Sequence, residues 1–133
     1  MTTQAEPEIH TITDEDTLHR RVKRIPNFIT NGRITSAVFK ISKLDLDNAL
    51  SVNLERLVDD IYTTFDIDTH ALVKIKAAVP ISLGCECKHT PLPDNYAHSS
   101  IYNITTRQQA RQLAASAIAF TSLDISGGPS SGT

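Results

Sequence analysis

The fold class is indicated by residues 97–118, which read AHSSIYNITTRQQARQLAASAI. Apolar and polar residues alternate over 97–104, and a period of two predicts a strand with one buried face. From Ala110 onward the apolar residues recur every three or four positions, which predicts an amphipathic helix. Thr105 and Gln108 have the spacing of a capping box at the start of that helix.

The rest of the chain adds further strands and one more helix. The predicted strands cover 18–25, which stops at Pro26, 33–41, 71–76, and 81–88 with a bend at Gly84. The predicted helix covers 51–62, with Ser51 as its cap. Turns are expected at Asn31-Gly32 and at 91–95. Strands and helices do not alternate in this order. We therefore expect an α+β domain with a mixed or mostly antiparallel sheet of about five strands and two helices.

The length of 133 residues and the composition favour one folded domain. Residues 1–16 are polar and acidic and are expected to form a flexible arm, and residues 124–133, rich in Gly, Ser and Pro, a disordered tail. The single α+β domain would then cover 17–123. No apolar run approaches the roughly 20 residues of a membrane-spanning helix, and the N-terminus lacks the pattern of a signal peptide. These features predict a cytoplasmic protein without membrane contact.

The two cysteines, Cys85 and Cys87, are one residue apart. A disulfide-stapled secreted scaffold is not expected from this pair, which supports a reducing compartment. With His89 and His98 the cysteines form a conceivable zinc set, but a single intervening residue is shorter than the usual ligand spacing. A buried pair of small apolar side chains is the favoured interpretation, and we expect neither a metal nor another cofactor.

Charge is distributed unevenly along the chain. Residues 19–43 hold seven bases and no acid, whereas the net charge of the whole chain is −2. If the strands 18–25 and 33–41 form a basic ribbon, guanidinium groups can bind phosphate oxygens and release counterions. The candidate partner-binding residues are Arg20, Arg21, Lys23, Arg24, Arg33 and Lys40. The alternative is that the ribbon pairs with an acidic helix carrying Glu55, Asp59 and Asp60, in solvated ion pairs of little energetic value.

A scattered polar set provides a candidate catalytic site. A serine beside a histidine can form a nucleophile and its base, and an arginine can bind an anion. The candidates are Arg20, Ser36 and His98. The alternative places Ser36 and His98 as ordinary sheet residues, since the chain contains no G-x-S-x-G, Walker, G-x-G-x-x-G or H-E-x-x-H motif.

Four segments carry a resemblance to known proteins: LHRRV (18–22), NGRITSAVFK (31–40), LSVNLERL (50–57) and PLPDNYAHS (91–99). Together they resemble a set of small, uncharacterised prokaryotic proteins, although Tyr96 stands where that pattern has proline. The resemblance implies a bacterial origin and a domain over roughly 17–119. A more distant similarity is to ADP-ribosyltransferase-like domains. That similarity implies that Arg20 meets a dinucleotide and that Ser36 supports the nicotinamide ribose, with Glu86 as the only candidate for the final-strand glutamate.

Two function classes are therefore expected. The first is a small binding or accessory module of a larger prokaryotic assembly, which contacts nucleic acid or an acidic protein face through the basic ribbon. The second is a nucleotide- or dinucleotide-processing enzyme that uses Arg20, Ser36 and His98. The sequence leaves the oligomeric state open.

Overall fold

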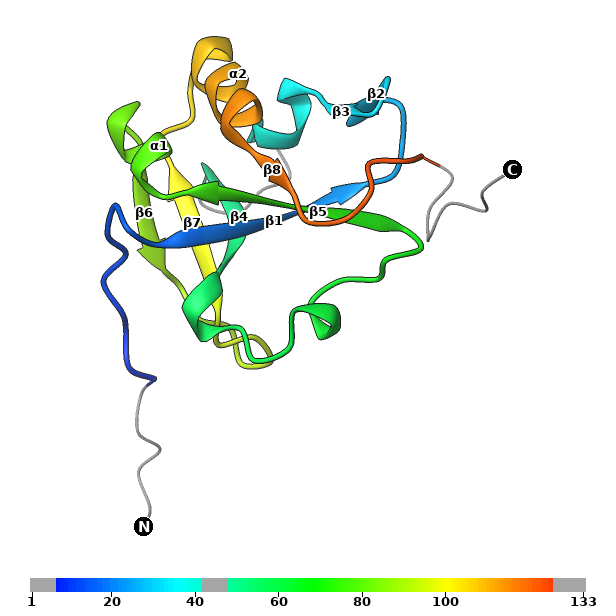
Figure 1. Cartoon of the computed structure of the whole chain (residues 1–133). Helices are drawn as coiled ribbons and strands as arrows, with labels where there is room; N and C mark the ends of the chain where they lie inside the picture. Colours follow the sequence, from blue (N-terminus) through cyan, green and yellow to red (C-terminus); the bar gives the residue numbers. More distant parts are fainter. Residues whose placement is uncertain (1–6, 42–47, 126–133) are drawn as a thin grey trace.

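A computed structural model describes residues 7–41 and 48–125 of the chain. These residues form an α+β fold, as expected, with an antiparallel six-stranded sheet in the order β6-β7-β4-β1-β5-β8 and a separate β2–β3 hairpin (Figure 1). The strands are β1 (Thr17–Lys23), β2 (Ile29–Thr30), β3 (Arg33–Ile34), β4 (Ala49–Leu54), β5 (His70–Lys76), β6 (Glu86–His89), β7 (His98–Tyr102) and β8 (Ile118–Ala119). The helices are α1 (Ala78–Ser82) and α2 (Arg107–Ser116), with 3₁₀ turns η1 (Ser36–Phe39), η3 (Glu55–Leu57) and η4 (Ile61–Thr63).

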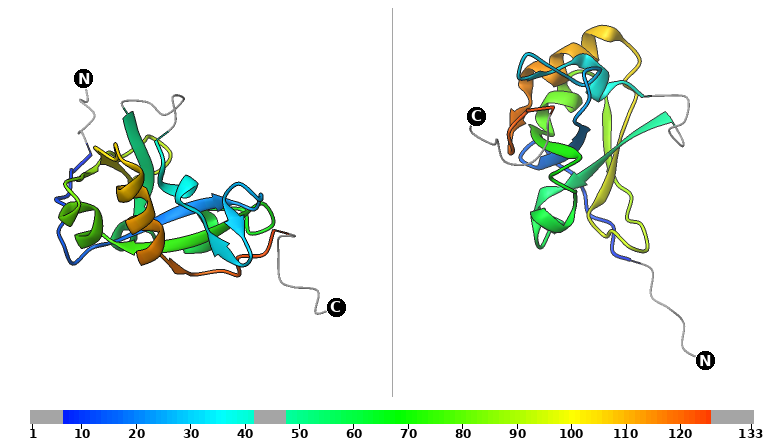
Figure 2. Two further views of the ribbon diagram at one scale, coloured as in Figure 1. Left: turned by 90° about the horizontal axis from the view of Figure 1, so that it is seen from above. Right: turned by 90° about the vertical axis from the view of Figure 1, so that its right-hand side faces the viewer.

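The sheet separates two layers. The helices α1 and α2, the turn η1 and the β2–β3 hairpin lie on one side of β1 and β5, and the chain between β4 and β5 lies on the other (Figure 1). Figure 2 shows α2 from above, lying across the strands. β1 pairs with β5 along its whole length but with β4 only at Leu18 and His19. Beyond His19 the two strands separate, and the candidate site forms at that divergence.

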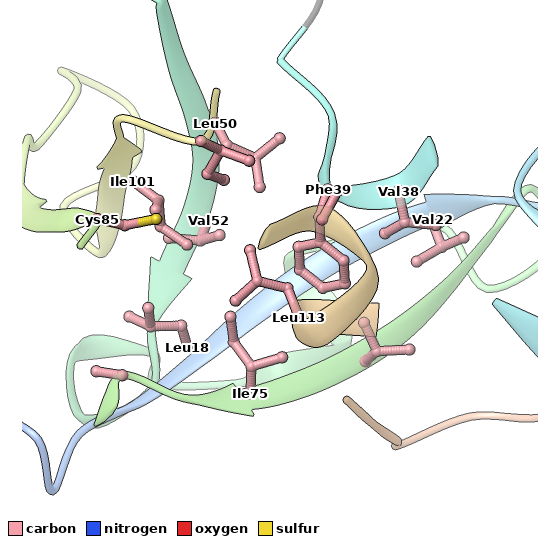
Figure 3. Close-up of a cluster of buried hydrophobic side chains, with 14 of the residues drawn as sticks. Leu18, Val22, Val38, Phe39, Leu50, Val52, Ile75, Cys85, Ile101 and Leu113 are labelled. Carbon is pink, nitrogen blue, oxygen red and sulfur yellow. The ribbon is translucent and has the colours of Figure 1, made fainter. Parts of the chain in front are cut away.

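The hydrophobic core lies between the sheet and the helices. Alternate residues of β1 point into it, so that Leu18 and Val22 are almost completely buried. Figure 3 shows these side chains packed around Phe39 of η1 and Leu113 of α2, both with no exposed surface. Each such side chain contributes about 1.5–3 kcal/mol relative to an exposed one. The core therefore holds η1 and α2 firmly against the strands.

The predicted helix over 51–62 is wrong, because its first residues form β4 and the rest form the short turns η3 and η4. In β4 Leu50, Val52 and Leu54 are buried on the core side. Ser51 and Asn53 alternate with them. The apolar residues from Leu54 onward also have the spacing of a helix, so the sequence pattern fits both structures. Hydrogen bonding to β7 and β1 favours the strand.

The predicted strand over 33–41 is also mostly wrong. Only Arg33–Ile34 is a strand, and the Thr35 side chain caps the turn η1 that follows. Val38 and Phe39 are adjacent and both buried, which a strand with one buried face does not allow. The Asn31-Gly32 turn is confirmed: both residues have positive φ, 54° and 72°, and they join β2 to β3 as a two-residue loop.

Two smaller boundaries also differ from expectation. Residues 81–88 divide between α1 and β6, with a break at Gly84, whose φ is +84°. The capping box of the last helix is Thr106 with Gln109, one position later than expected, since both T-x-x-Q pairs fit the sequence pattern. Burial of Ala110 and Leu113 fixes the rotation of α2 and so selects the second pair.

The segment 8–16, expected to be part of a flexible arm, lies along the body of the protein. Arg56 donates hydrogen bonds to the Asp16 carboxylate at 2.9 Å and to the Thr11 carbonyl at 2.9 Å. The His10 amide donates to His89 Nδ1 at 2.9 Å. Residues 1–6 and 126–133, which contain most of the expected tails, fall outside the described residues. Within the described ranges, no helix is both long and apolar enough to span a membrane.

Candidate functional site

The candidate site is a pocket of about 320 Å³ at the point where β1 and β4 separate. Its floor and walls come from β1, β4, β7 and the loop between β6 and β7. Two of its lining residues, Arg20 and Arg21, carry positive charge, and Asp94 is the single carboxylate among them. The pocket is therefore polar and open, with a cationic side formed by β1.

Arg20 spans the gap between the two separating strands. Its Nη1 donates to the Ser51 carbonyl of β4 at 2.8 Å, and its Nε donates to the Val38 carbonyl of η1 at 3.1 Å. A guanidinium group can replace the missing ladder hydrogen bonds in this way because it offers several donors in one plane. Arg20 thus fixes the backbone of Ser51 at the edge of the pocket.

Beside Ser51, His98 of β7 is held by hydrogen bonds on both ring nitrogens. Its Nδ1 lies 2.8 Å from the Thr90 carbonyl oxygen, and its Nε2 lies 3.2 Å from Ser51 Oγ. The Thr90 hydroxyl is 2.7 Å from Ser100 Oγ and 3.1 Å from the same His98 Nδ1. Strands β4 and β7 therefore present a serine and an imidazole side by side.

His19 of β1, which also lines the pocket, belongs to an ion-pair network whose other members, Glu55 and Lys74, are partly exposed. His19 is 3% exposed, and its Nε2–H donates to the Glu55 carboxylate at 2.8 Å, where Lys74 Nζ also binds at 2.8 Å. Burial lowers the pKa of His19, although Glu55 opposes this shift. The hydrogen bonds from Lys74 and His19 lower the pKa of Glu55. The Nδ1 atom of His19 is buried and has no hydrogen-bond partner in the described part of the chain.

A second pocket, of about 220 Å³, is also lined by Arg20 and Arg21, together with Lys23 and His70. Arg21 and Lys23 are exposed, and no carboxylate of residues 7–41 or 48–125 pairs with either. Burial lowers the pKa of His70, and the charges of Arg21 and Lys23 lower it further. The charge of Asp66 opposes this lowering of the His70 pKa. We call the exposed pair Arg21 and Lys23 the β1 cationic surface.

The predicted basic ribbon does not form, because β1 pairs with β4 and β5 instead of with residues 33–41. Arg24 is only 6% exposed, and its guanidinium donates to the backbone carbonyls of Ile67, Ser122 and Asp124. Arg33 is exposed in a different groove, beside Arg111 of α2. Lys40 is exposed after η1. The six candidate partner-binding residues are therefore divided among several regions.

The structure brings together two members of the predicted catalytic set. Arg20 and His98 line the same pocket, but Ser36 lies in η1 and lines the groove with Arg33 and Arg111. Glu86, the candidate final-strand glutamate, is paired with Lys88 at 3.0 Å. Sequence reasoning missed Ser51 as a site residue because it placed that serine at a helix cap. The alternation of ALSVNL over 49–54 was the signal that could have placed it on a strand beside His98.

The cysteines and histidines of the conceivable zinc set serve other contacts. The Cys85 thiol donates to the Asn103 carbonyl, and His89 Nε2 donates to the Tyr96 carbonyl at 2.6 Å. Burial raises the pKa of the Cys87 thiol to about 12, so that the thiolate form that binds metal is disfavoured. Among the described residues, no group of three or more His, Cys, Asp or Glu side chains is arranged to hold a metal ion.

Comparisons with known proteins found no match, so the proposed function rests on the fold and the site. The chain matched no family model, no curated protein and no solved structure.

Proposed function

We propose that this chain is a small binding module of a larger assembly, and that it holds an anionic partner at the β1 cationic surface. The observation that carries the proposal is the pair of pockets that Arg20 and Arg21 both line; among the described residues, Asp94 is the single carboxylate of the two linings. Guanidinium groups bind phosphate and carboxylate oxygens through paired donors. The same surface therefore fits a nucleic-acid backbone or an acidic protein face.

Two further features support the setting in which this module works. Cys85 and Cys87 are both free, and secreted proteins of this size usually pair their cysteines, which supports a cytoplasmic location. The resemblance of four sequence segments to small prokaryotic proteins supports a bacterial origin. A nucleotide-processing enzyme built on Arg20, Ser36 and His98 is less well supported, because Ser36 lines a different pocket.

The proposal is tested by fluorescence anisotropy with two labelled probes, a DNA duplex and an oligoglutamate peptide. Each is titrated with the full chain over about 50 to 500 mM salt, because counterion release makes such binding depend steeply on salt. We expect one probe to bind with an affinity that falls as salt rises. The probe that binds identifies the class of partner.

Paired variants locate the binding surface. The double substitution Arg21→Ala with Lys23→Ala removes two exposed cations from β1, and we expect the slope of log affinity against log salt to fall by about 2 for DNA. The matched control is Arg33→Ala with Arg111→Ala, which removes two cations from the other groove and should leave the slope unchanged. Binding of neither probe, or loss of binding in the control pair alone, would contradict the proposal.

A further inference from the structure

The geometry of Ser51 and His98 is that of a nucleophile and its general base. Ser51 is exposed on β4, its Oγ is 3.2 Å from His98 Nε2, and both residues line the pocket at the β1–β4 divergence. A base must lie within hydrogen-bond reach of the proton that it removes, and this pair meets that condition. The pocket leaves space on the same side for a ligand.

The tautomer of His98 follows from its other hydrogen bond. The Thr90 carbonyl oxygen, 2.8 Å from His98 Nδ1, can only accept, so Nδ1 carries the proton. Nε2 then has a free lone pair, and the Ser51 hydroxyl donates to it. This is the arrangement of a serine activated by an oriented imidazole, with a backbone carbonyl in the place that a carboxylate takes in a catalytic triad.

The surroundings of Ser51 hold the pair in place and make the pocket selective for charge. Arg20 fixes the Ser51 carbonyl from one side, and β7 supplies His98 from the other. The charged and titratable groups that line the pocket are His19, Arg20, Arg21, Asp94 and His98. The exposed guanidinium of Arg21 at this pocket favours a substrate that carries an anionic group.

We propose that Ser51 is an acyl-accepting nucleophile, with His98 as its base, and that the chain hydrolyses carboxylic esters whose acyl or alcohol part carries an anionic group. The choice of an anionic substrate rests on the proposed function of the β1 cationic surface. The nucleophilic pair itself rests only on the geometry of β4 and β7. Arg21 is the exposed cation that would hold the substrate's charge.

The reaction needs no reactant other than the ester and water. Ser51 Oγ attacks the ester carbonyl carbon while its proton passes to His98 Nε2. The carbon–oxygen bond to the alcohol then breaks, and the alcohol leaves with that proton. Water attacks the acyl-serine, giving its proton to His98, which returns it to Ser51 Oγ as the carboxylic acid departs.

The first test is covalent labelling with a fluorophosphonate, which reports an activated serine without any anionic substrate. We expect a single adduct on Ser51, found by peptide mass spectrometry, and at least about a 100-fold slower labelling in His98→Gln. Ser51→Ala should abolish the adduct. The matched control is Ser36→Ala, which changes a serine of η1 in the other groove and should label at the wild-type rate.

A second variant separates loss of the base from loss of folding, since His98 also holds the Thr90 loop. Ser51→Cys places a thiol beside His98, and a neighbouring imidazole stabilises the thiolate. We expect iodoacetamide to alkylate Cys at position 51 near neutral pH, well before the native Cys85 and Cys87. If neither the fluorophosphonate nor iodoacetamide distinguishes position 51 from an ordinary side chain in the folded protein, the nucleophile does not exist.

The substrate class is tested with p-nitrophenyl acetate and mono-p-nitrophenyl succinate. We expect the succinate ester to be hydrolysed faster, and Arg21→Ala to remove that preference. A chain that binds DNA or oligoglutamate but forms no adduct would overturn this inference and leave the proposed binding function standing. An adduct on Ser51 in a chain that binds neither probe would support the nucleophile and overturn the proposed binding function. Equal rates of hydrolysis for the two esters would overturn the choice of an anionic substrate.

Discussion

The arginines within β1 and directly after it have different roles. Arg20 points toward the core side and bridges β4 and η1, Arg21 points to the opposite face and is exposed, and Arg24 is buried against backbone carbonyls. Alternation along the strand assigns the faces. Position along the chain then decides the contacts: Arg20 and Arg21 lie where β1 separates from β4 and line pockets, whereas Arg24 lies further along and contacts Ser122 and Asp124.

Arg24→Ala tests the structural role at the scale of one residue. The substitution leaves the Ile67, Ser122 and Asp124 carbonyls without their donor, and we expect it to lower the free energy of unfolding by about 3 kcal/mol. Urea denaturation monitored by circular dichroism measures the change. The control Arg21→Ala removes an exposed guanidinium from β1, which ends directly before Arg24, and should change stability by less than about 0.5 kcal/mol. Equal effects of the two substitutions would show that Arg24 does not fasten the C-terminal segment.

At the scale of the element, β4 decides the site. A helix over 51–62 would have placed Ser51 at a cap, far from any partner strand. Pairing with β7 instead places Ser51 opposite Ser100, with His98 two residues further along. The brief pairing of β4 with β1 ends at His19, so the strands separate directly beside Ser51. The pocket is thus a consequence of strand pairing and not of any local motif.

The start of α2 offers a sharp test at the same scale, because two threonines compete for the cap. The Thr106 side chain accepts from the Gln109 amide at 3.1 Å, whereas the Thr105 side chain makes only a 3.5 Å contact with the Gln109 side chain. We expect Thr106→Ala to cost about 1 kcal/mol of stability. Thr105→Ala should cost less than half of that. Thermal unfolding of both variants gives the comparison, and a larger loss for Thr105→Ala would move the helix start by one residue.

The stability of the whole molecule is expected to fall as the pH is lowered. Burial lowers the pKa of His19 below its usual value of 6.5, so folding favours the neutral ring. The stability from this residue is complete above about pH 6.5 and is lost as the pH falls through the lowered folded value. Glu55, whose pKa is also lowered from its usual value of 4.5, adds a loss in the same direction at more acidic pH.

Urea unfolding of wild type and of His19→Gln, measured between about pH 8 and pH 5, tests this dependence. Glutamine can still donate to Glu55 but does not titrate. We expect the difference in stability between the two proteins to shrink as the pH falls. A difference that stays constant over this range would show that His19 does not contribute to the pH dependence.

The sequence alone determined the fold class. It also determined those strands and the helix whose residues fit only one of the two periods, that of a strand or that of a helix. Alternation over 71–76 and 97–104 was sufficient to predict β5 and β7, and the Ala-rich stripe was sufficient for α2. It also located the basic block and named Arg20 and His98. These features depend on periodicity and composition, which are local properties of the chain.

Only the tertiary structure decided which of these residues meet. Residues 50–58 carry both a strand period and a helix period, and the partner strands β7 and β1 selected the first. That selection placed Ser51, and not Ser36, beside His98. The reason is physical: contacts between residues 40 or more positions apart depend on the packing of whole elements, which no short window of sequence contains.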